Sequence, residues 1–137
     1  MNKTAKMKNT KSMLKIGSFN IGRNIDAIFA LKLKYYMDTL NIDILCLQET
    51  SHCNSDQSRL VKIFSPYISY WSNDPQKRGV GQGVGIITRS NIIGQLNIIE
   101  PGYLIELQLH GTKTAFLYNM YYCRFISINK DKIRSIN

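Results

Sequence analysis

The chain has 137 residues, which is enough for one domain and too few for two separate cores of ordinary size. Its composition, 44% hydrophobic and 20% charged, is that of a globular protein. No apolar run is long enough to cross a bilayer, so the sequence predicts no membrane partner. The formal net charge of +9 favours a polyanion, such as nucleic acid, as a partner.

The positive charge lies at the two ends of the chain. Residues 1–15 carry five lysines and no acid, and residues 124–137 carry four basic residues and one acid, whereas the body between them is nearly neutral. Basic tails can hold a polyanion non-specifically. Solvated, disordered tails are the alternative, which the composition favours. We therefore expect tails over 1–13 and 123–137 around a single domain over 14–122.

The cysteines are Cys46, Cys53 and Cys123, an odd number whose spacing fits neither a disulfide framework nor a zinc site. Cys46 lies inside an apolar run and is expected in the core. Cysteines used in this way favour a reducing, intracellular location. The lysines are spaced out rather than clustered, so the sequence does not separate a nuclear from a cytoplasmic location.

The first half of the chain predicts a β-α-β unit. A strand over 14–19 is followed by a helix over 25–40, capped by Asn24 and stopped by Asn41. A strand over 43–48 comes next, and its continuous apolar residues predict burial on both faces. The two strands should be parallel neighbours joined by a right-handed crossover. The apolar face of the helix is predicted to consist of Ile25, Ile28, Phe29, Leu33, Tyr36, Met37 and Leu40.

The second half is dominated by strands. A polar loop over 51–58 leads to a short helix through Leu60, Val61 and Phe64, with Ser55 or Asp56 as its cap. Further strands separated by turn residues are predicted over 67–72, 84–89, 92–99, 103–109 and 114–121. The fold class is therefore α+β, with a mixed β-sheet and one well-defined crossover helix.

Glu49 is the first candidate for a functional residue, because it follows the buried strand directly. Carboxylates at strand ends can bind Mg²⁺, which usually takes one or two protein carboxylates and keeps several waters. The alternative is a surface or capping glutamate. Asn20 follows the parallel neighbouring strand, so we expect it at the same edge of the sheet, where its amide could orient a phosphate. The alternative for Asn20 is an ordinary turn asparagine.

Other residues give weaker signals. Trp71 could stack on a base, with Lys77 and Arg78 nearby to contact phosphates, but a core aromatic is the favoured alternative for Trp71. His52 and His110 lie in different loops without metal-type spacing, and each is expected to be solvated. The glycines of the loop before residue 84 lack the Gly-Lys-Ser/Thr ending of a phosphate-binding loop, and a strand follows them instead of a helix.

Several blocks of the sequence, taken in order, resemble the endonuclease/exonuclease/phosphatase superfamily, and most of all its apurinic-type endonucleases and the endonuclease domains of non-LTR retrotransposons. The most specific block, 43–50, reads Asp-Ile-Leu-Cys-Leu-Gln-Glu-Thr. The other similar blocks are 14–20, 70–72, 83–89 and 119–121. The resemblance covers roughly 14–122 and implies the first half of a four-layer α/β-sandwich.

The resemblance also implies a site and a partner. Glu49 would ligate Mg²⁺ or Mn²⁺, Asn20 would support the catalytic network, Tyr121 would contact the phosphate, and DNA would be the substrate. The family motif continues from its tyrosine to Pro-Asn, whereas here Tyr121 is followed by Tyr122, Cys123 and Arg124. Neither the Asp-x-Asn motif nor the terminal Asp-His pair of the family follows Tyr121.

The sequence therefore predicts an N-terminal fragment of a Mg-dependent phosphodiesterase or endonuclease that nicks DNA, of the retrotransposon type and inactive alone. The alternative is a non-catalytic nucleic-acid-binding module that uses its basic termini; no protein partner is predicted. A nucleotide-binding domain is disfavoured because a phosphate loop is lacking. Since the family's second sheet was expected from the missing half, one face of the sheet should be exposed.

Overall fold

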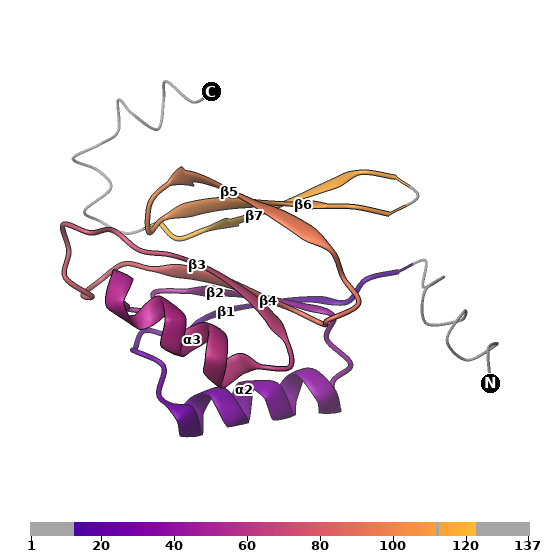
Figure 1. Cartoon of the computed structure of the whole chain (residues 1–137), viewed down its shortest axis with the longest axis horizontal. Helices are drawn as coiled ribbons and strands as arrows, with labels where there is room; N and C mark the ends of the chain where they lie inside the picture. Colours follow the sequence, from indigo (N-terminus) through magenta and orange to yellow (C-terminus); the bar gives the residue numbers. More distant parts are fainter. Residues whose placement is uncertain (1–12, 112, 123–137) are drawn as a thin grey trace.

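The computed structural model describes residues 13–111 and 113–122 (Figure 1). The predicted tails therefore lie outside the described residues, apart from Met13. The elements in chain order are β1 (Ile16–Asn20), α2 (Ala27–Thr39), β2 (Ile44–Gln48), the 3-10 turn η1 (Asn54–Asp56), α3 (Gln57–Phe64), β3 (Ile68–Ser72), β4 (Val84–Thr88), β5 (Gly94–Glu100), β6 (Leu104–Leu109) and β7 (Ala115–Met120).

The strands form two sheets. Sheet A is mixed and has the order β1-β2-β4-β3, in which β1 and β2 are parallel and β4 runs antiparallel to both its neighbours. Sheet B is the antiparallel meander β5-β6-β7. The α+β class and the parallel β-α-β unit are confirmed. The predicted mixed sheet is confirmed as sheet A, in which β4 inserts between β2 and β3. The last three strands form a second sheet of their own.

The layers are two helices, sheet A and sheet B, with α2 and α3 on one face of sheet A and sheet B on the other (Figure 1). Strand β2 shows why its sequence is continuously apolar. Leu45 and Leu47 pack against the helices, whereas Ile44 and Cys46 pack against sheet B. The predicted burial of this strand on both faces, with Cys46 in the core, is confirmed.

The expectation that one face of the sheet carrying Glu49 is exposed is wrong. The inward residues of β6 (Ile105, Leu107 and Leu109) cover that face from within the same chain. Some of the large apolar side chains that remain exposed lie on β1 and β7, which are edge strands of the two sheets. They are Ile16 and Phe19 on β1, and Phe116, Tyr118 and Met120 on β7.

The crossover helix α2 is confirmed, with two local differences from the prediction. Its N-cap is Asp26, whose carboxylate accepts from the Phe29 amide at 2.7 Å, and not Asn24. Asn41 takes the left-handed conformation expected of a helix stop, with φ 54°. The predicted apolar face was too wide. Ala30, Leu33 and Met37 are its buried residues, and the exposed residues of the predicted face are Ile28, Tyr36 and Leu40.

No helix in the described ranges 13–111 and 113–122 is both long enough and apolar enough to span a membrane.

Candidate functional site

The candidate site lies at the edge of sheet A where β1 and β2 end. The parallel register pairs Asn20 with Gln48, and Glu49 follows immediately. Strand β4 begins at this edge, because Val84 pairs with Gln48 in the antiparallel direction. The structure thus places Asn20 and Glu49 at one edge of the sheet, where α/β folds commonly build their sites.

The carboxylate of Glu49 is partly exposed and makes no hydrogen bond or ion pair within 13–111 and 113–122. Every aspartate in these ranges is engaged: Asp26 by the Phe29 amide and Arg23, Asp38 by Tyr67 and Arg89, Asp43 by the Lys15 amide and Arg89, Asp56 by the Cys53 amide and Arg59, and Asp74 by the Gln76 amide and Tyr103. Glu49 therefore remains available to an external ligand.

The backbone that carries Glu49 is unusual. Glu49 has φ 56° and Ser51 has φ 50°, so two non-glycine residues in three adopt the left-handed region. Such residues cost of order 1–3 kcal/mol each and persist only where the surroundings hold them; they cluster at functional sites. Left-handed backbone on both sides of Thr50 turns the chain sharply at the end of β2.

Asn119, which lies in the sequence block over 119–121, belongs to this region although it was not predicted as a site residue. It is 2% exposed, and its amide donates to the carbonyl of Leu47 at 3.0 Å and to that of Gly85 at 2.8 Å. Its oxygen accepts from Nε2 of Gln48 at 2.8 Å. Asn119 thereby ties β7 of sheet B to β2 and β4 of sheet A directly behind Glu49. The sequence signal that could have identified Asn119 is its polar side chain at an inward-facing position of β7.

Gln48 continues the same network toward β1. Its amide nitrogen donates to the Ser18 hydroxyl at 3.0 Å as well as to Asn119. Asn20 is exposed one step beyond, and its side chain makes no hydrogen bond to the described part of the chain. Amide side chains therefore brace the edge behind Glu49, while Asn20 and Glu49 keep their own polar groups toward solvent.

Tyr121 lies just past the end of β7 and is largely buried. Its amide donates to the carbonyl of Tyr103 at 2.7 Å, and the two rings stack with centroids 6.2 Å apart at 11°. The Tyr103 hydroxyl in turn donates to Asp74 at 3.1 Å. The ring of Tyr121 is thus held rigidly, so any contact of Tyr121 with a ligand has to come from the small part that reaches the surface.

Trp71 belongs to the core and is 4% exposed. It packs against Phe64, and its indole N–H donates to the Ser69 hydroxyl at 2.8 Å. Because base stacking needs an exposed ring face, the structure supports the alternative of a core aromatic and not a nucleic-acid contact.

The expectation that His52 is solvated is wrong, whereas His110 is exposed as expected. His52 is fully buried edge-on against Trp71, and its Nδ1 lies 2.7 Å from the Thr50 hydroxyl. Its Nε2 has no partner in the described part of the chain. Burial lowers the pKa of the imidazole to about 4, with a smaller opposing effect of Asp56. His52 is therefore a neutral core residue next to the Glu49 turn.

The loop between β3 and β4 packs against this turn. The amide of Ser51 donates to the Gln82 carbonyl at 2.8 Å, and that of Thr50 to the Gly83 carbonyl at 3.2 Å. Gly83 has φ 102°, and a Cβ there would lie 2.3 Å from the Thr50 hydroxyl oxygen, so only glycine fits. The basic residues Lys77 and Arg78 are exposed in the same loop.

The residues present suit a hydrated divalent cation. In the described ranges no group of three or more His, Cys, Asp and Glu side chains is arranged to hold a metal. A single carboxylate with solvent access is nevertheless a normal anchor for Mg²⁺, which usually keeps several waters. Glu49 would be the carboxylate ligand, and the exposed amide of Asn20 lies at the same edge.

No protein-family model and no curated protein sequence matches the chain. Solved structures do match its fold. The AP endonuclease LMAP from Leishmania major superimposes with a TM-score of 0.61 at 16% identity, over 80% of this chain and 40% of that one. An AP endonuclease from Archaeoglobus fulgidus gives 0.59 at 23% identity, over 80% and 41%. TDP2 from D. rerio, complexed with a single-stranded DNA product, gives 0.53 at 18% identity, over 92% and 54%.

These likenesses establish the fold. Over the matched part, the chain shares the fold of these two AP endonucleases and of TDP2, and the predicted α+β architecture is confirmed. The chain spans only 40% to 54% of the length of these three structures.

Proposed function

We propose that this chain is the first part of a metal-dependent phosphodiesterase that cleaves DNA, of the type found in non-LTR retrotransposons. The observation that carries the proposal is Glu49. It is a partly exposed carboxylate at the end of the central strand, held on a left-handed backbone and left without an internal partner in the described ranges. The superfamily fold and the sequence block over 43–50 support the same role.

In this proposal each residue has a separate task. Glu49 would hold a Mg²⁺ or Mn²⁺ ion, which would supply positive charge to polarise a phosphoryl oxygen and to stabilise a leaving alkoxide. Asn20, beside it at the strand end, orients the phosphate through its amide. Tyr121 is the expected phosphate contact from sheet B, with its ring fixed by stacking on Tyr103.

DNA bound at Glu49 would meet the loop between β3 and β4, which packs directly against the turn after Glu49. Lys77 and Arg78 project from this loop and are the proposed phosphate contacts. In Lys77→Ala/Arg78→Ala, the affinity for a DNA duplex should fall, and the slope of log affinity against log salt should decrease by about 2. Fluorescence anisotropy at several salt concentrations measures both quantities; an unchanged slope argues against this contact.

We further propose that the 137-residue chain is inactive by itself. A phosphodiesterase of this kind needs a group to activate the water as well as a metal ligand. In this proposal Glu49 is taken up by the metal, and His52 is buried and neutral, so neither is free to act as the general base at this edge. Incubation of the purified chain with supercoiled plasmid and Mg²⁺ should leave the plasmid intact. Nicking that is lost in Glu49→Gln would overturn the proposed inactivity.

The experiment that tests the metal role is a titration of the purified chain with MnCl₂, followed by the EPR signal of free Mn²⁺. The wild-type chain should remove Mn²⁺ from solution at one site, and Glu49→Gln should abolish this binding. Asp74→Asn is a suitable control, because Asp74 is already engaged by Tyr103 and the Gln76 amide. Equal binding by wild type and Glu49→Gln would refute the proposed ligand.

The alternative of a non-catalytic nucleic-acid-binding module predicts a different pattern. Its basic termini lie outside the described residues, so its test is a deletion of residues 1–13. Loss of DNA binding in that deletion, together with unchanged binding in Glu49→Gln and in Lys77→Ala/Arg78→Ala, would favour the module over the phosphodiesterase.

A further inference from the structure

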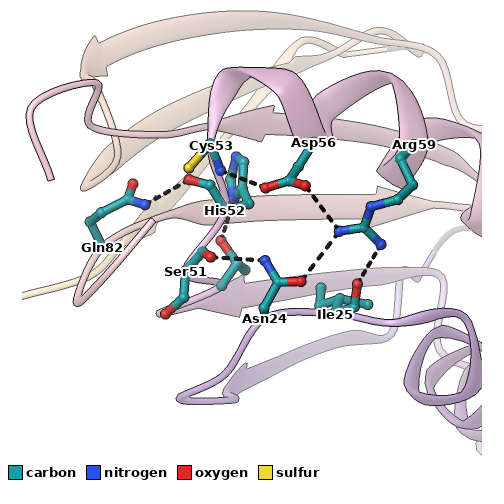
Figure 2. Close-up of polar contacts among 9 residues, drawn as sticks. Asn24, Ile25, Ser51, His52, Cys53, Asp56, Arg59 and Gln82 are labelled. Atoms are coloured by element: carbon teal, nitrogen blue, oxygen red, sulfur yellow. Dashed lines mark hydrogen bonds and ion pairs between the residues drawn. The ribbon is translucent and has the colours of Figure 1, made fainter. Parts of the chain in front are cut away.

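A polar network joins three segments around the turn that carries Glu49 (Figure 2). Its centre is Arg59, on the first turns of α3. The guanidinium donates from Nη1 to the carbonyl of Ile25 at 2.7 Å and from Nη2 to the side-chain oxygen of Asn24 at 3.3 Å. Nη2 also pairs with the carboxylate of Asp56 at 3.4 Å. Arg59 thereby connects α3 to the segment between β1 and α2.

Both side-chain partners of Arg59 hold the backbone that follows Glu49. The amide of Asn24 donates to the carbonyl of Ser51 at 2.8 Å. The second oxygen of Asp56 accepts from the amide of Cys53 at 2.9 Å. Figure 2 shows these bonds on one side of the turn and the Gln82 amide on the other. Gln82 donates to the carbonyl of His52 at 2.7 Å.

The network explains how the turn keeps its backbone. Left-handed residues such as Glu49 and Ser51 persist only where their surroundings determine them. Ser51 is fixed from both sides, by Asn24 at its carbonyl and by Gln82 at its amide. Asn24 in turn lies in the segment that follows Asn20. The network therefore fixes the strand end that carries Glu49 relative to the one that carries Asn20.

We infer that Arg59, acting through Asn24 and Asp56, is a positioning residue that sets Glu49 in the orientation needed to bind a divalent cation. This inference rests on the proposed function of Glu49 as the cation ligand. The ion pair with Asp56 is partly exposed and contributes little by itself. The contribution of Arg59 comes from its planar fork, which reaches a carbonyl, an amide oxygen and a carboxylate at once. A lysine ammonium has one charged nitrogen and cannot span the three.

The test compares Arg59→Met, Arg59→Lys and wild type in the MnCl₂ titration. Removing a residue that orients a metal ligand typically costs 10- to 100-fold in metal affinity. We expect about 10-fold weaker Mn²⁺ binding in Arg59→Met and a smaller loss in Arg59→Lys. Met37→Ala is the matched control: Met37 is a buried residue of α2, so its loss lowers the melting temperature without touching the turn. Its Mn²⁺ affinity should equal that of wild type.

A second readout does not depend on metal. Amide hydrogen exchange, measured by NMR, should become faster at Ser51 and Cys53 in Arg59→Met. Exchange at amides inside β2 should stay at the wild-type rate. In Met37→Ala we expect the opposite pattern: amide exchange should become faster in the core, with no selective change at Ser51 and Cys53.

The outcomes separate the inference from the proposed function. If wild type binds Mn²⁺ through Glu49 and Arg59→Met binds it equally well, the positioning role is refuted while the ligand role stands. If wild type and Glu49→Gln both fail to bind, the proposed function itself is refuted and the inference falls with it. If Met37→Ala weakens binding as much as Arg59→Met, the effect is general destabilisation, and the positioning role is again refuted.

Discussion

The two ends of strand β2 carry carboxylates in opposite situations. At its start, Asp43 is 4% exposed and accepts from the Lys15 amide at 2.8 Å, and it faces Nε of Arg89 at 3.6 Å. At its end, Glu49 is partly exposed and has no internal partner within the described ranges. One strand thus separates a carboxylate used for folding from one left available to a ligand. The comparison gives the proposed function its physical basis.

The largest expected effect on stability comes from removing the Asp43 carboxylate at the start of β2. In Asp43→Ala, the Lys15 amide loses its acceptor and Arg89 loses its mostly buried ion-pair partner, although it keeps Asp38 and the Met37 carbonyl. We expect a loss of about 2–3 kcal/mol in the free energy of unfolding. Urea denaturation measures the loss. Asp43→Asn, which keeps an acceptor oxygen for the Lys15 amide, should lose clearly less. A loss below about 0.5 kcal/mol in Asp43→Ala would contradict the structural role.

The second prediction concerns pH at the Glu49 end. His52 has a folded-state pKa of about 4, below its ordinary value of 6.5. Above pH 6.5 the side chain is neutral in both the folded and the unfolded chain, so the protonation of His52 costs no stability there. Below pH 6.5 the unfolded chain takes up a proton that the folded chain does not. Stability should therefore fall as pH drops toward 4, by about 2 kcal/mol at pH 5. Urea titrations at pH 7 and pH 5 measure this change.

Two variants control the pH prediction. His52→Gln should remove this component of the pH dependence between 6.5 and 5, whereas His110→Gln should retain it, because His110 is exposed. An equal pH dependence in His52→Gln and wild type would show that the burial of His52 is not its origin.

The third prediction concerns a substitution that introduces strain into the turn after Glu49. In Gly83→Ala, the new Cβ meets the Thr50 hydroxyl at 2.3 Å and the residue has to keep φ 102°, so we expect a loss of about 1–2 kcal/mol. The Mn²⁺ affinity should fall with it, because Gly83 accepts from the Thr50 amide next to Glu49. Gly81→Ala, whose Cβ meets nothing within 4 Å, is the matched control for the left-handed backbone alone. Equal losses in both variants would argue against the contact with Thr50.

The smallest effect on stability is expected at the second end of β2. Glu49→Gln removes a charge that has no internal partner in the described ranges, so the free energy of unfolding should change by less than about 0.5 kcal/mol. Thermal unfolding of Glu49→Gln and of Asp43→Asn compares the stability effects of substitutions at the two ends of β2. A large destabilisation in Glu49→Gln would mean that this carboxylate serves the fold, as Asp43 does.

Most of the local structure was predictable because it follows from short-range patterns. The apolar run over 44–47 indicated a strand buried on both faces, and Asn41 indicated the helix stop; both are confirmed. The division into two sheets was not predictable. Whether β4 joins β2 or β5 depends on long-range packing, and its sequence suits either arrangement.

The candidate site was predictable only in part. The position of Asn20 beside the end of β2 followed from the parallel pairing of two consecutive strands. The burial of His52 and the role of Asn24 did not follow, because a polar residue in a loop sequence gives no sign of what packs over it. Asn24 is well suited to cap a helix, yet its amide instead bonds to Ser51, 27 residues away. Such contacts are visible only in three dimensions.

The most direct test of the account is to map Mn²⁺ onto both ends of β2 in one experiment. Substoichiometric MnCl₂ added to the ¹⁵N-labelled chain should broaden the amide signals of Asn20, Glu49 and Thr50 and leave those of Asp43 and Ile44 sharp. In Glu49→Gln this broadening should disappear. Broadening centred on Asp43 would contradict the claim that the Glu49 carboxylate binds the metal. Broadening around residue 49 that remains in Glu49→Gln would contradict it as well.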